Sequence, residues 1–211
     1  HIDIERLISL VTTHLCNPFI KKGKGRAMTK HHMNYETLLK VTKALSMSKD
    51  PKEIIRITVH SIKETLNMKG CAIYLVNDET NEFELAASHG LSDKYLGKGP
   101  VSVSRPVAKS LTEGPVAIYD IQDDPRVQYV EEAKEEGIAA ILSIPIYFAG
   151  ESLGVLRLYH NEVWEVSQQD CDSLLILAEQ IGMSMQYTRL LNVVRSINQT
   201  LLELPMGGTV A

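Results

Sequence analysis

The segment from residue 114 to residue 159 most constrains how this chain can fold. It contains three short apolar runs separated by polar stretches, which is typical of buried strands: residues 116–120, 141–148 and 153–159. The last two runs flank Ala149-Gly150-Glu151-Ser152, a turn sequence that predicts a β-hairpin. We therefore expect antiparallel strands at the centre of the fold.

A helix start is predicted between the first two of these strands, at Asp124-Pro125. Aspartate is a favoured N-cap, and proline suits the first helical position because its missing N–H would have no partner there. The charged run that follows ends at Gly137, so we expect a short helix from Pro125 to just before that glycine. Its carboxylates are expected to face solvent.

The periodicity of apolar residues predicts the other elements. Helices are expected over 2–17, over 34–47, from Pro51 after an Asp50 cap, over 104–114 and over 167–204, and strands over 71–76 and 83–87. Strands joined by hairpins and bounded by helices indicate an α+β fold.

The composition excludes several classes of protein. The chain has 211 residues, 44% of them hydrophobic, and a formal net charge of −4, which argues against nucleic acid as a partner. Its three cysteines, Cys16, Cys71 and Cys171, are far apart and predict reduced thiols in a cytoplasmic protein. No apolar run is long enough to span a membrane.

No motif predicts catalysis or a metal site. The seven histidines show no ligand spacing, and a haem ligand at His89 or His160 is left as a remote alternative. A nucleophile–base pair, a phosphate loop and an acid dyad are all absent from the sequence pattern. We therefore expect no enzyme activity, and the sequence identifies no cofactor.

The last predicted helix carries an unusually regular apolar stripe. Its members are separated by 4, 3, 4, 3, 4 and 3 residues: Met183, Tyr187, Leu190, Val194, Ile197, Leu201 and Leu204. This is an a/d heptad pattern, and the neighbouring positions are mostly polar. The stripe either packs on its own domain or forms an interface with a second copy. We favour the homodimer, since a stripe buried within a domain is usually wider.

Five segments together resemble a GAF domain, the sensory module of many signalling proteins. They are, in order, residues 70–76, 90–100, 121–129, 137–145 and 154–159. The resemblance implies a profilin- or PAS-like antiparallel sheet of six strands, with the N- and C-terminal helices on one face and a pocket under loops on the other. It also implies parallel dimerisation through the terminal helices. We divide the chain into an N-terminal helix and basic linker (1–33), the GAF domain (34–190) and a coiled-coil-like extension with a tail (191–211).

The resemblance makes small-molecule sensing the first functional hypothesis, with a nucleotide or small carboxylate as ligand. The expected pocket residues are Ser102, Ser104, Asp120, Asp124, Arg126 and Tyr129. Arg126 is the main candidate, because a guanidinium near a helix N-terminus could bind an anion. Three of these residues also have a structural alternative: Asp124 as an N-cap, Arg126 as a bridge to Asp123 or Asp120, and Tyr129 packed under the helix.

Two other functions stay open at this point. The pocket could be filled by side chains, so that the module is a ligand-free dimerisation or docking scaffold, with a signalling partner acting in trans. Free methionine sulfoxide reductases share the resemblance, but they need cysteines around the pocket. Cys71 begins a predicted strand and Cys171 opens the last helix, which disfavours that activity.

Overall fold

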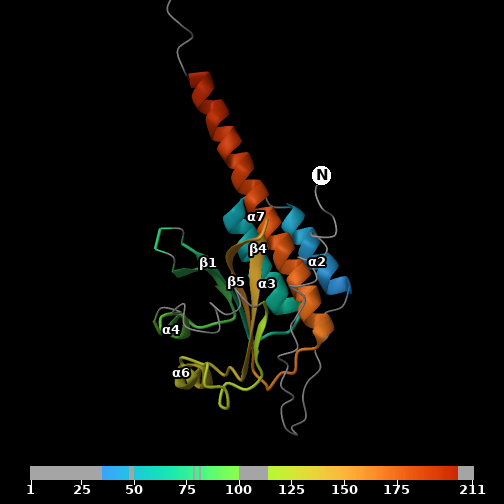
Figure 1. Ribbon diagram of the computed structural model, residues 1–211, viewed down its shortest axis with the longest axis vertical. Coiled ribbons are helices and arrows are strands. Elements are labelled where there is room, and N and C mark those ends of the chain that lie inside the picture. Colours follow the sequence, from blue (N-terminus) through green and yellow to red (C-terminus); the bar gives the residue numbers. More distant parts are fainter. Residues whose placement is uncertain (1–34, 48–49, 78, 81, 100–113, 204–211) are drawn as a thin grey trace, which may run out of the picture.

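The computed structural model describes residues 35–203, apart from 48–49, 78, 81 and 100–113 (Figure 1). The elements are α2 (Tyr35–Met47), α3 (Pro51–Thr65), β1 (Gly70–Val76), β2 (Phe83–His89), α4 (Asp93–Leu96), β3 (Val116–Ile118), α6 (Val130–Glu135), β4 (Ala140–Phe148), β5 (Glu151–His160) and α7 (Gln168–Glu203). The helices expected over 2–17 and 104–114, the basic linker, Ser102 and Ser104 lie outside the described residues.

The described strands form one antiparallel sheet in the order β2-β1-β5-β4-β3. Each of the five predicted apolar or alternating runs forms one of these strands. The expectation of six strands is wrong for the described residues, which contain five. The individual strands located in the sequence number five, and the count of six was what the family resemblance implied.

The β4–β5 hairpin is tighter than the predicted four-residue turn. Strand β5 begins at Glu151, so only Ala149 and Gly150 form the connection. Both have positive φ angles, 51° and 85°. Two left-handed residues make a turn whose twist matches that of the paired strands.

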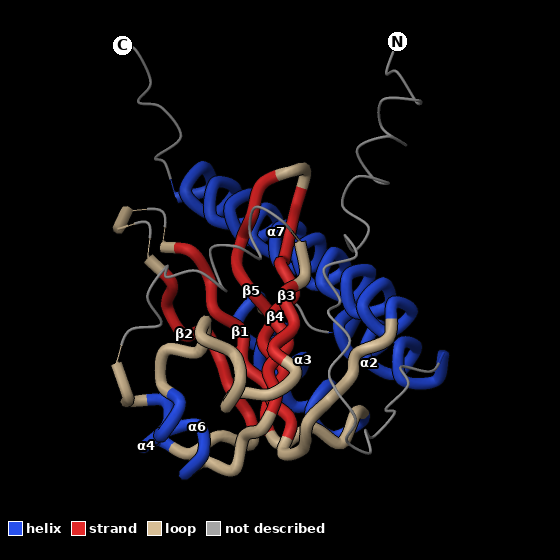
Figure 2. The backbone as a smooth tube through the Cα atoms, turned by 60° about the horizontal axis from the view of Figure 1, so that its bottom comes forward, coloured by secondary structure: helices blue, strands red, loops and turns tan. Residues whose placement is uncertain are grey.

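The two faces of the sheet are buried against different partners. Helices α2, α3 and α7 lie together on one side of the strands, with α4 and α6 apart from them (Figure 2). The helix-side core includes Ile62 of α3, Leu156 and Leu158 of β5, and Leu177 and Ile181 of α7. A second, smaller cluster on the opposite face joins the sheet to α4 and α6.

Two helix starts follow the sequence signals. The Asp50 side chain accepts the Lys52 N–H at 3.1 Å, and α3 begins at Pro51, which confirms the predicted cap. Before α7, the Ser167 hydroxyl accepts the Asp170 N–H at 3.1 Å. Both side chains satisfy backbone donors that have no partner in the first turn of a helix.

The predicted helix start at Asp124-Pro125 is wrong. The Asp124 carboxylate accepts the Arg126 N–H at 3.0 Å, and the Asp124 carbonyl accepts the Val127 N–H at 3.2 Å, so these residues form a turn. Helix α6 begins only at Val130. Asp-Pro favours turns for the same reasons that it favours helix starts, and here the turn forms.

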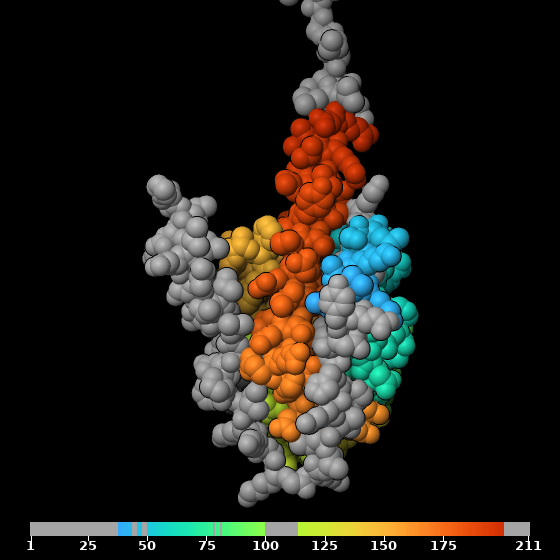
Figure 3. All heavy atoms as spheres, turned by 90° about the vertical axis from the view of Figure 1, so that its right-hand side faces the viewer, coloured from blue at the N-terminus to red at the C-terminus, as the bar shows by residue number. Residues whose placement is uncertain are grey.

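Helix α7 changes its surroundings along its length. Leu174, Leu177 and Ile181 are buried against the sheet, whereas Tyr187 and Leu190 are 64% and 61% exposed. Figure 3 shows the later half of α7 projecting beyond the body of the domain, with α2 beside its earlier half. The stripe predicted from the sequence therefore lies mainly on the part of α7 that its own domain leaves uncovered.

Close packing of α7 on the sheet depends on Gly182. A Cβ at this position would overlap the carbonyl oxygen of Tyr147 at the end of β4, and a backbone atom cannot move aside as a flexible side chain can. Alanine normally stabilises a helix relative to glycine by up to about 1 kcal/mol. At position 182, the steric conflict with the Tyr147 carbonyl makes glycine more favourable than alanine.

We expect Gly182→Ala to lower the free energy of unfolding by about 1–3 kcal/mol, the usual cost of overpacking. Urea unfolding monitored by circular dichroism measures this change. Ser196→Ala, at an exposed position on the same helix, is the matched control and should leave the midpoint nearly unchanged. A Gly182→Ala variant as stable as the parent would contradict the close approach.

Candidate ligand-binding face

An arginine lies in the middle of the sheet, on the face opposite the long helices. Arg157 of β5 pairs in register with Ala72 of β1 and Ser143 of β4. Its chain neighbours Leu156 and Leu158 belong to the helix-side core. Because successive side chains of a strand point to opposite faces, Arg157 points to the face covered by α4 and α6.

The Arg157 side chain is buried, and no described residue supplies a compensating charge. The residue is 8% exposed, and its Nε atom has no hydrogen-bond partner. The Ser143 hydroxyl, opposite it in the register, is also buried without a hydrogen-bond partner. Among the described residues, no carboxylate forms an ion pair with Arg157. Buried charges in proteins are usually paired, so this arrangement favours an anionic ligand.

Aromatic rings surround the guanidinium. The Arg157 Cζ lies 5.4 Å from the centroid of the Tyr159 ring, and Tyr159 meets Tyr95 of α4 edge to face at 5.9 Å. Burial raises the pKa of Tyr159 well above its usual value and that of Tyr95 to about 12. Both phenols are therefore neutral near pH 7 and do not balance the arginine charge.

A second cation stands over the same aromatic group. The Lys98 Nζ atom lies 3.3 Å from the centroid of the Tyr95 ring and donates to the Tyr95 carbonyl oxygen at 2.9 Å. Burial, and then the charge of Arg157, lower the pKa of Lys98 to about 8. Two positive groups that disfavour each other's charge make this face electropositive.

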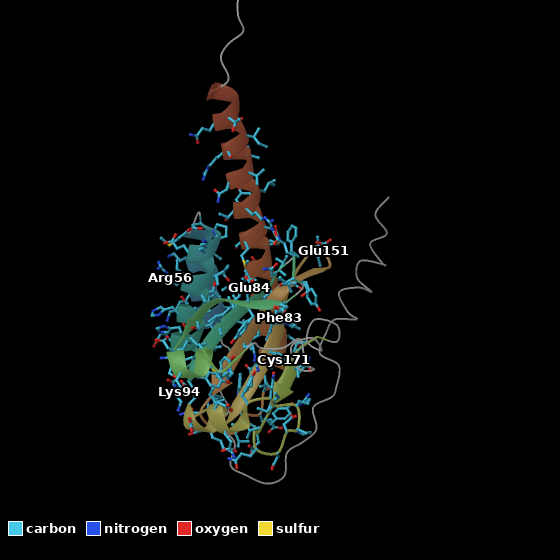
Figure 4. The ribbon with its side chains drawn as sticks, turned by 90° about the vertical axis from the view of Figure 1, so that its left-hand side faces the viewer. Arg56, Phe83, Glu84, Lys94, Glu151 and Cys171 are labelled. Carbon is cyan, nitrogen blue, oxygen red and sulfur yellow. The ribbon has the colours of Figure 1, made fainter. Side chains whose placement is uncertain are left out.

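A polar network holds α4 against the end of α6. The Glu136 carboxylate accepts the Ser92 N–H and the Lys69 ammonium, each at 3.0 Å, and also the Ser92 hydroxyl. Burial acts to raise the pKa of Glu136, but these donors outweigh it and hold the pKa below its usual value. Lys94, on the outer side of α4 in Figure 4, pairs with Glu135. The network thus fixes the position of Tyr95. The nearby carboxylates of Glu135 and Glu136 are already paired within it.

Arg126, the main pocket residue expected from the sequence, already has partners. Its Nε donates to the Asp124 carboxylate at 2.8 Å, and its Nη2 donates to the Ala117 carbonyl of β3 at 2.9 Å. Partial burial acts to raise the pKa of Asp124, yet the hydrogen bonds and charge of Arg126 lower it overall. The pair ties the 121–127 turn to the edge of the sheet.

The other expected residues fall in different places. Asp120 lies beyond the end of β3, and its carboxylate accepts the Gln122 N–H at 2.9 Å. Tyr129 precedes α6, and its ring centroid lies 5.8 Å from the Lys98 Nζ. Of the four described residues in the expected set, only Tyr129 contacts this aromatic and cationic group.

Arg157 and Lys98 were missed by the sequence analysis. The signal for Arg157 was present: a charged residue in the apolar strand Leu153-Gly-Val-Leu-Arg-Leu-Tyr159. A buried charge within a strand is rare and is often functional. Lys98 follows α4 in a glycine-containing loop, and nothing local distinguishes it from a solvent-exposed lysine.

The two described cysteines lie away from this face. Cys71 and Cys171 both belong to the helix-side core. Burial raises the pKa of the Cys71 thiol, so this residue is a poor nucleophile at neutral pH.

These features define an α+β domain with one face covered by α2, α3 and α7 and one electropositive, aromatic face. The family model of the GAF domain matches residues 48–186, and the chain therefore belongs to the GAF domain family. GAF domains are typically sensory or regulatory modules, and the resemblance noted in the sequence is confirmed.

Known proteins similar to this chain include a phosphotransferase-system protein, a sensor histidine kinase domain and a free methionine-R-sulfoxide reductase from Neisseria meningitidis, the last 16% identical with a TM-score of 0.64 over 79% of this chain and 99% of that one. This chain is 25% identical over 170 residues to a curated Salmonella typhimurium protein named "Phosphoenolpyruvate-dependent phosphotransferase system". The match covers 75% of this chain but only 22% of the relative.

Two solved structures show the same fold. The GAF domain of a Coxiella burnetii phosphoenolpyruvate-protein phosphotransferase is 22% identical, with a TM-score of 0.66 over 75% of this chain and 95% of that one. A domain of a Sinorhizobium meliloti two-component sensor histidine kinase is 23% identical, with a TM-score of 0.59 over 68% and 96%. None of the described helices is long and apolar enough to cross a membrane.

The lowered pKa of Lys98 predicts a specific pH dependence of stability. The folded protein releases the Lys98 proton near pH 8, whereas the unfolded chain holds it until about the usual lysine value of 10.5. The unfolded state therefore binds more protons between these values, and this group makes stability rise with pH across the window. Lys98→Met should remove that rise, as measured by urea unfolding from pH 7 to pH 10.5.

Lys94→Met is the matched control, because the ion pair with Glu135 shifts the pKa of Lys94 upward. This variant should retain the rise that depends on Lys98. If the free energy of unfolding rose equally with pH in the parent and in Lys98→Met, Lys98 would not be desolvated.

Proposed function

We propose that this GAF domain is a sensory module that binds a small anionic molecule at Arg157. The single observation that carries the proposal is the buried guanidinium, whose Nε has no hydrogen-bond partner and which has no ion pair with a described residue. Replacing such a charge by an apolar side chain is often neutral or stabilising, so its presence indicates a use beyond folding.

The surroundings of Arg157 favour a carboxylate or phosphate group on a small organic molecule. An arginine can bind either group through two parallel hydrogen bonds, and the Ser143 hydroxyl offers a further donor on the same face. Lys98 adds a second positive charge, and Tyr95 supplies an apolar ring surface. A nucleotide or a small carboxylate, the two ligand classes expected from the sequence, would each satisfy these groups.

The site residues expected from the sequence take secondary roles in this proposal. Tyr129 would contact the ligand beside Lys98. Ser102 and Ser104, which lie outside the described residues, stay predicted ligand contacts. Asp120, Asp124 and Arg126 would shape the loop at the edge of the sheet, where Arg126 keeps 36% of its side chain exposed.

Thermal-shift measurements with nucleotides and small carboxylates test the ligand site. A ligand at about 100 times its Kd stabilises the folded state by about 2.7 kcal/mol, which raises the Tm by several degrees. Arg157→Met should abolish this shift while leaving the ligand-free Tm unchanged or higher, since it removes an unpaired buried charge. Native mass spectrometry of the purified protein would identify a ligand that is retained.

The Arg126→Ala variant distinguishes the role of Arg126 from that of Arg157. It should lower the ligand-free Tm, because Asp124 and the Ala117 carbonyl lose their partner, but the ligand-induced shift should persist. Loss of the shift in Arg126→Ala alone would move the site to the 121–127 loop. No shift with any probe in the parent protein would favour the ligand-free scaffold.

We further propose that the output passes through α7 in a homodimer. The described members of the heptad stripe are about half exposed or more: Met183 51%, Tyr187 64%, Leu190 61%, Val194 46% and Ile197 54%. Burying an aliphatic side chain stabilises an association by roughly 1.5–3 kcal/mol. A parallel pair of α7 helices would cover this stripe by coiled-coil packing.

A ligand at Arg157 would influence that pair through β5 and β4. Strand β5 carries Arg157 on one face and the helix-side residues Leu156 and Leu158 on the other. Helix α7 packs on β4 at Gly182. Binding can shift the dimer only if the ligand prefers one arrangement of these elements. The similar proteins make a kinase or a phosphotransferase, attached or in trans, the proposed recipient.

Sedimentation velocity tests the dimer. Leu190→Glu combined with Val194→Glu should convert a dimer to a monomer, because two charges per chain would be buried in the seam. A chain truncated after Tyr187 should also be monomeric. Asn192→Glu with Ser196→Glu, on the opposite side of the heptad, is the matched control and should remain dimeric. A dimer that survives the truncation would refute the α7 interface.

A further inference from the structure

A cluster of two histidines and a glutamate lies on the outer surface, away from Arg157. His60 and Glu64 are four residues apart on α3 and therefore lie on one side of the helix. His89 is the last residue of β2, which packs beside α3. We call these three residues the His60–Glu64–His89 cluster.

The ligand atoms of this cluster are already close together. The His60 Nδ1 lies 3.2 Å from the His89 Nε2, which lies 3.3 Å from the Glu64 Oε1. All three ligand atoms fall within 4.8 Å of one another. In a tetrahedral zinc site with bonds of about 2.0–2.1 Å, two ligand atoms lie about 3.3–3.4 Å apart. Two of the three separations thus match those of a metal site.

The chemistry of the cluster also fits a transition metal. Imidazole nitrogens suit zinc, copper, iron and nickel, and a carboxylate completes a common set of three protein ligands. His60 is exposed and His89 is half-buried beside a surface cavity of about 350 Å³, so a fourth position is open to water. Arg56, which also lines the cavity, lies on the outer side of α3 in Figure 4.

Lys63 is the main competitor for the carboxylate. Its Nζ lies 2.8 Å from the Glu64 Oε1, and this hydrogen bond, together with the lysine charge, lowers the pKa of Glu64. The side chain is long and partly exposed, so it can move to the other carboxylate oxygen or into solvent. The carboxylate therefore stays accessible to a cation.

We propose that the His60–Glu64–His89 cluster binds a divalent transition metal of the zinc class, with water as the fourth ligand. The metal would link the side chains of α3 to the end of β2, an element that packs against α3. It would stabilise the helix layer on that side of the domain. This site is independent of the proposed anion site, because its residues belong to a different surface.

Spectroscopy with Co²⁺ as the probe tests the site on the full chain. Tetrahedral coordination should produce visible d–d absorption that saturates at one equivalent and disappears when Zn²⁺ is added. His60→Ala, His89→Ala and Glu64→Gln should each weaken Co²⁺ binding at least about tenfold, since even outer partners of metal ligands contribute that much. Circular dichroism would confirm that these surface variants are folded.

Two controls test the other histidine pair and the competing lysine. His31→Ala with His32→Ala removes the adjacent histidine pair of the sequence and should leave the signal intact. Lys63→Ala should retain or strengthen binding, because it removes the competing ammonium. Absorption that is lost only in the His31/His32 variant, or that is equal in all variants, would overturn the proposal. The three side chains would then serve only to form hydrogen bonds with one another.

Discussion

Burial of both faces of the central strands β4 and β5 is the constraint on which the rest of the structure depends. One face meets α2, α3 and α7 and is mainly apolar, with Leu156 and Leu158 in its core. Among the described residues, the other face meets α4, α6 and the turn before α6, and it contains Arg157 and Ser143. A sheet buried on both sides must satisfy or neutralise every polar group that it encloses. On the second face, the Arg157 Nε and the Ser143 hydroxyl have no hydrogen-bond partner, so that requirement is met only in part.

The incomplete pairing of Arg157 connects the fold to the proposed function. The helix-side core and the close approach of α7 to β4 hold β5 in place, so the guanidinium cannot turn to solvent. The carboxylate best placed to approach α4, that of Glu136, is occupied by Ser92 and Lys69. The fold therefore keeps a positive charge desolvated on the same face as Lys98, and under the proposed function both charges would attract a bound anion.

Local sequence signals predicted much of the fold but little of the site. Asp50-Pro51 starts α3 as expected, since a cap needs only its neighbouring N–H groups. Asp124-Pro125 looked equivalent, yet the Arg126 side chain and the β3 carbonyl at Ala117 stabilise a turn there instead. That competition involves a residue distant in sequence, which no local pattern contains. Arg126 consequently appeared free to bind a ligand, whereas the tertiary structure uses it to fix a loop.

The sequence by itself determined the α+β class, the five strands and the exposed stripe on α7, because periodicity and turn chemistry act over a few residues. It also showed an arginine within an apolar strand, without saying what surrounds it. Only the tertiary structure decided that Arg157, Lys98 and Tyr95 share one face, and that His60, Glu64 and His89 meet on another. Strand register and helix packing bring together residues far apart in the chain, and side-chain charge matters only once those neighbours are known.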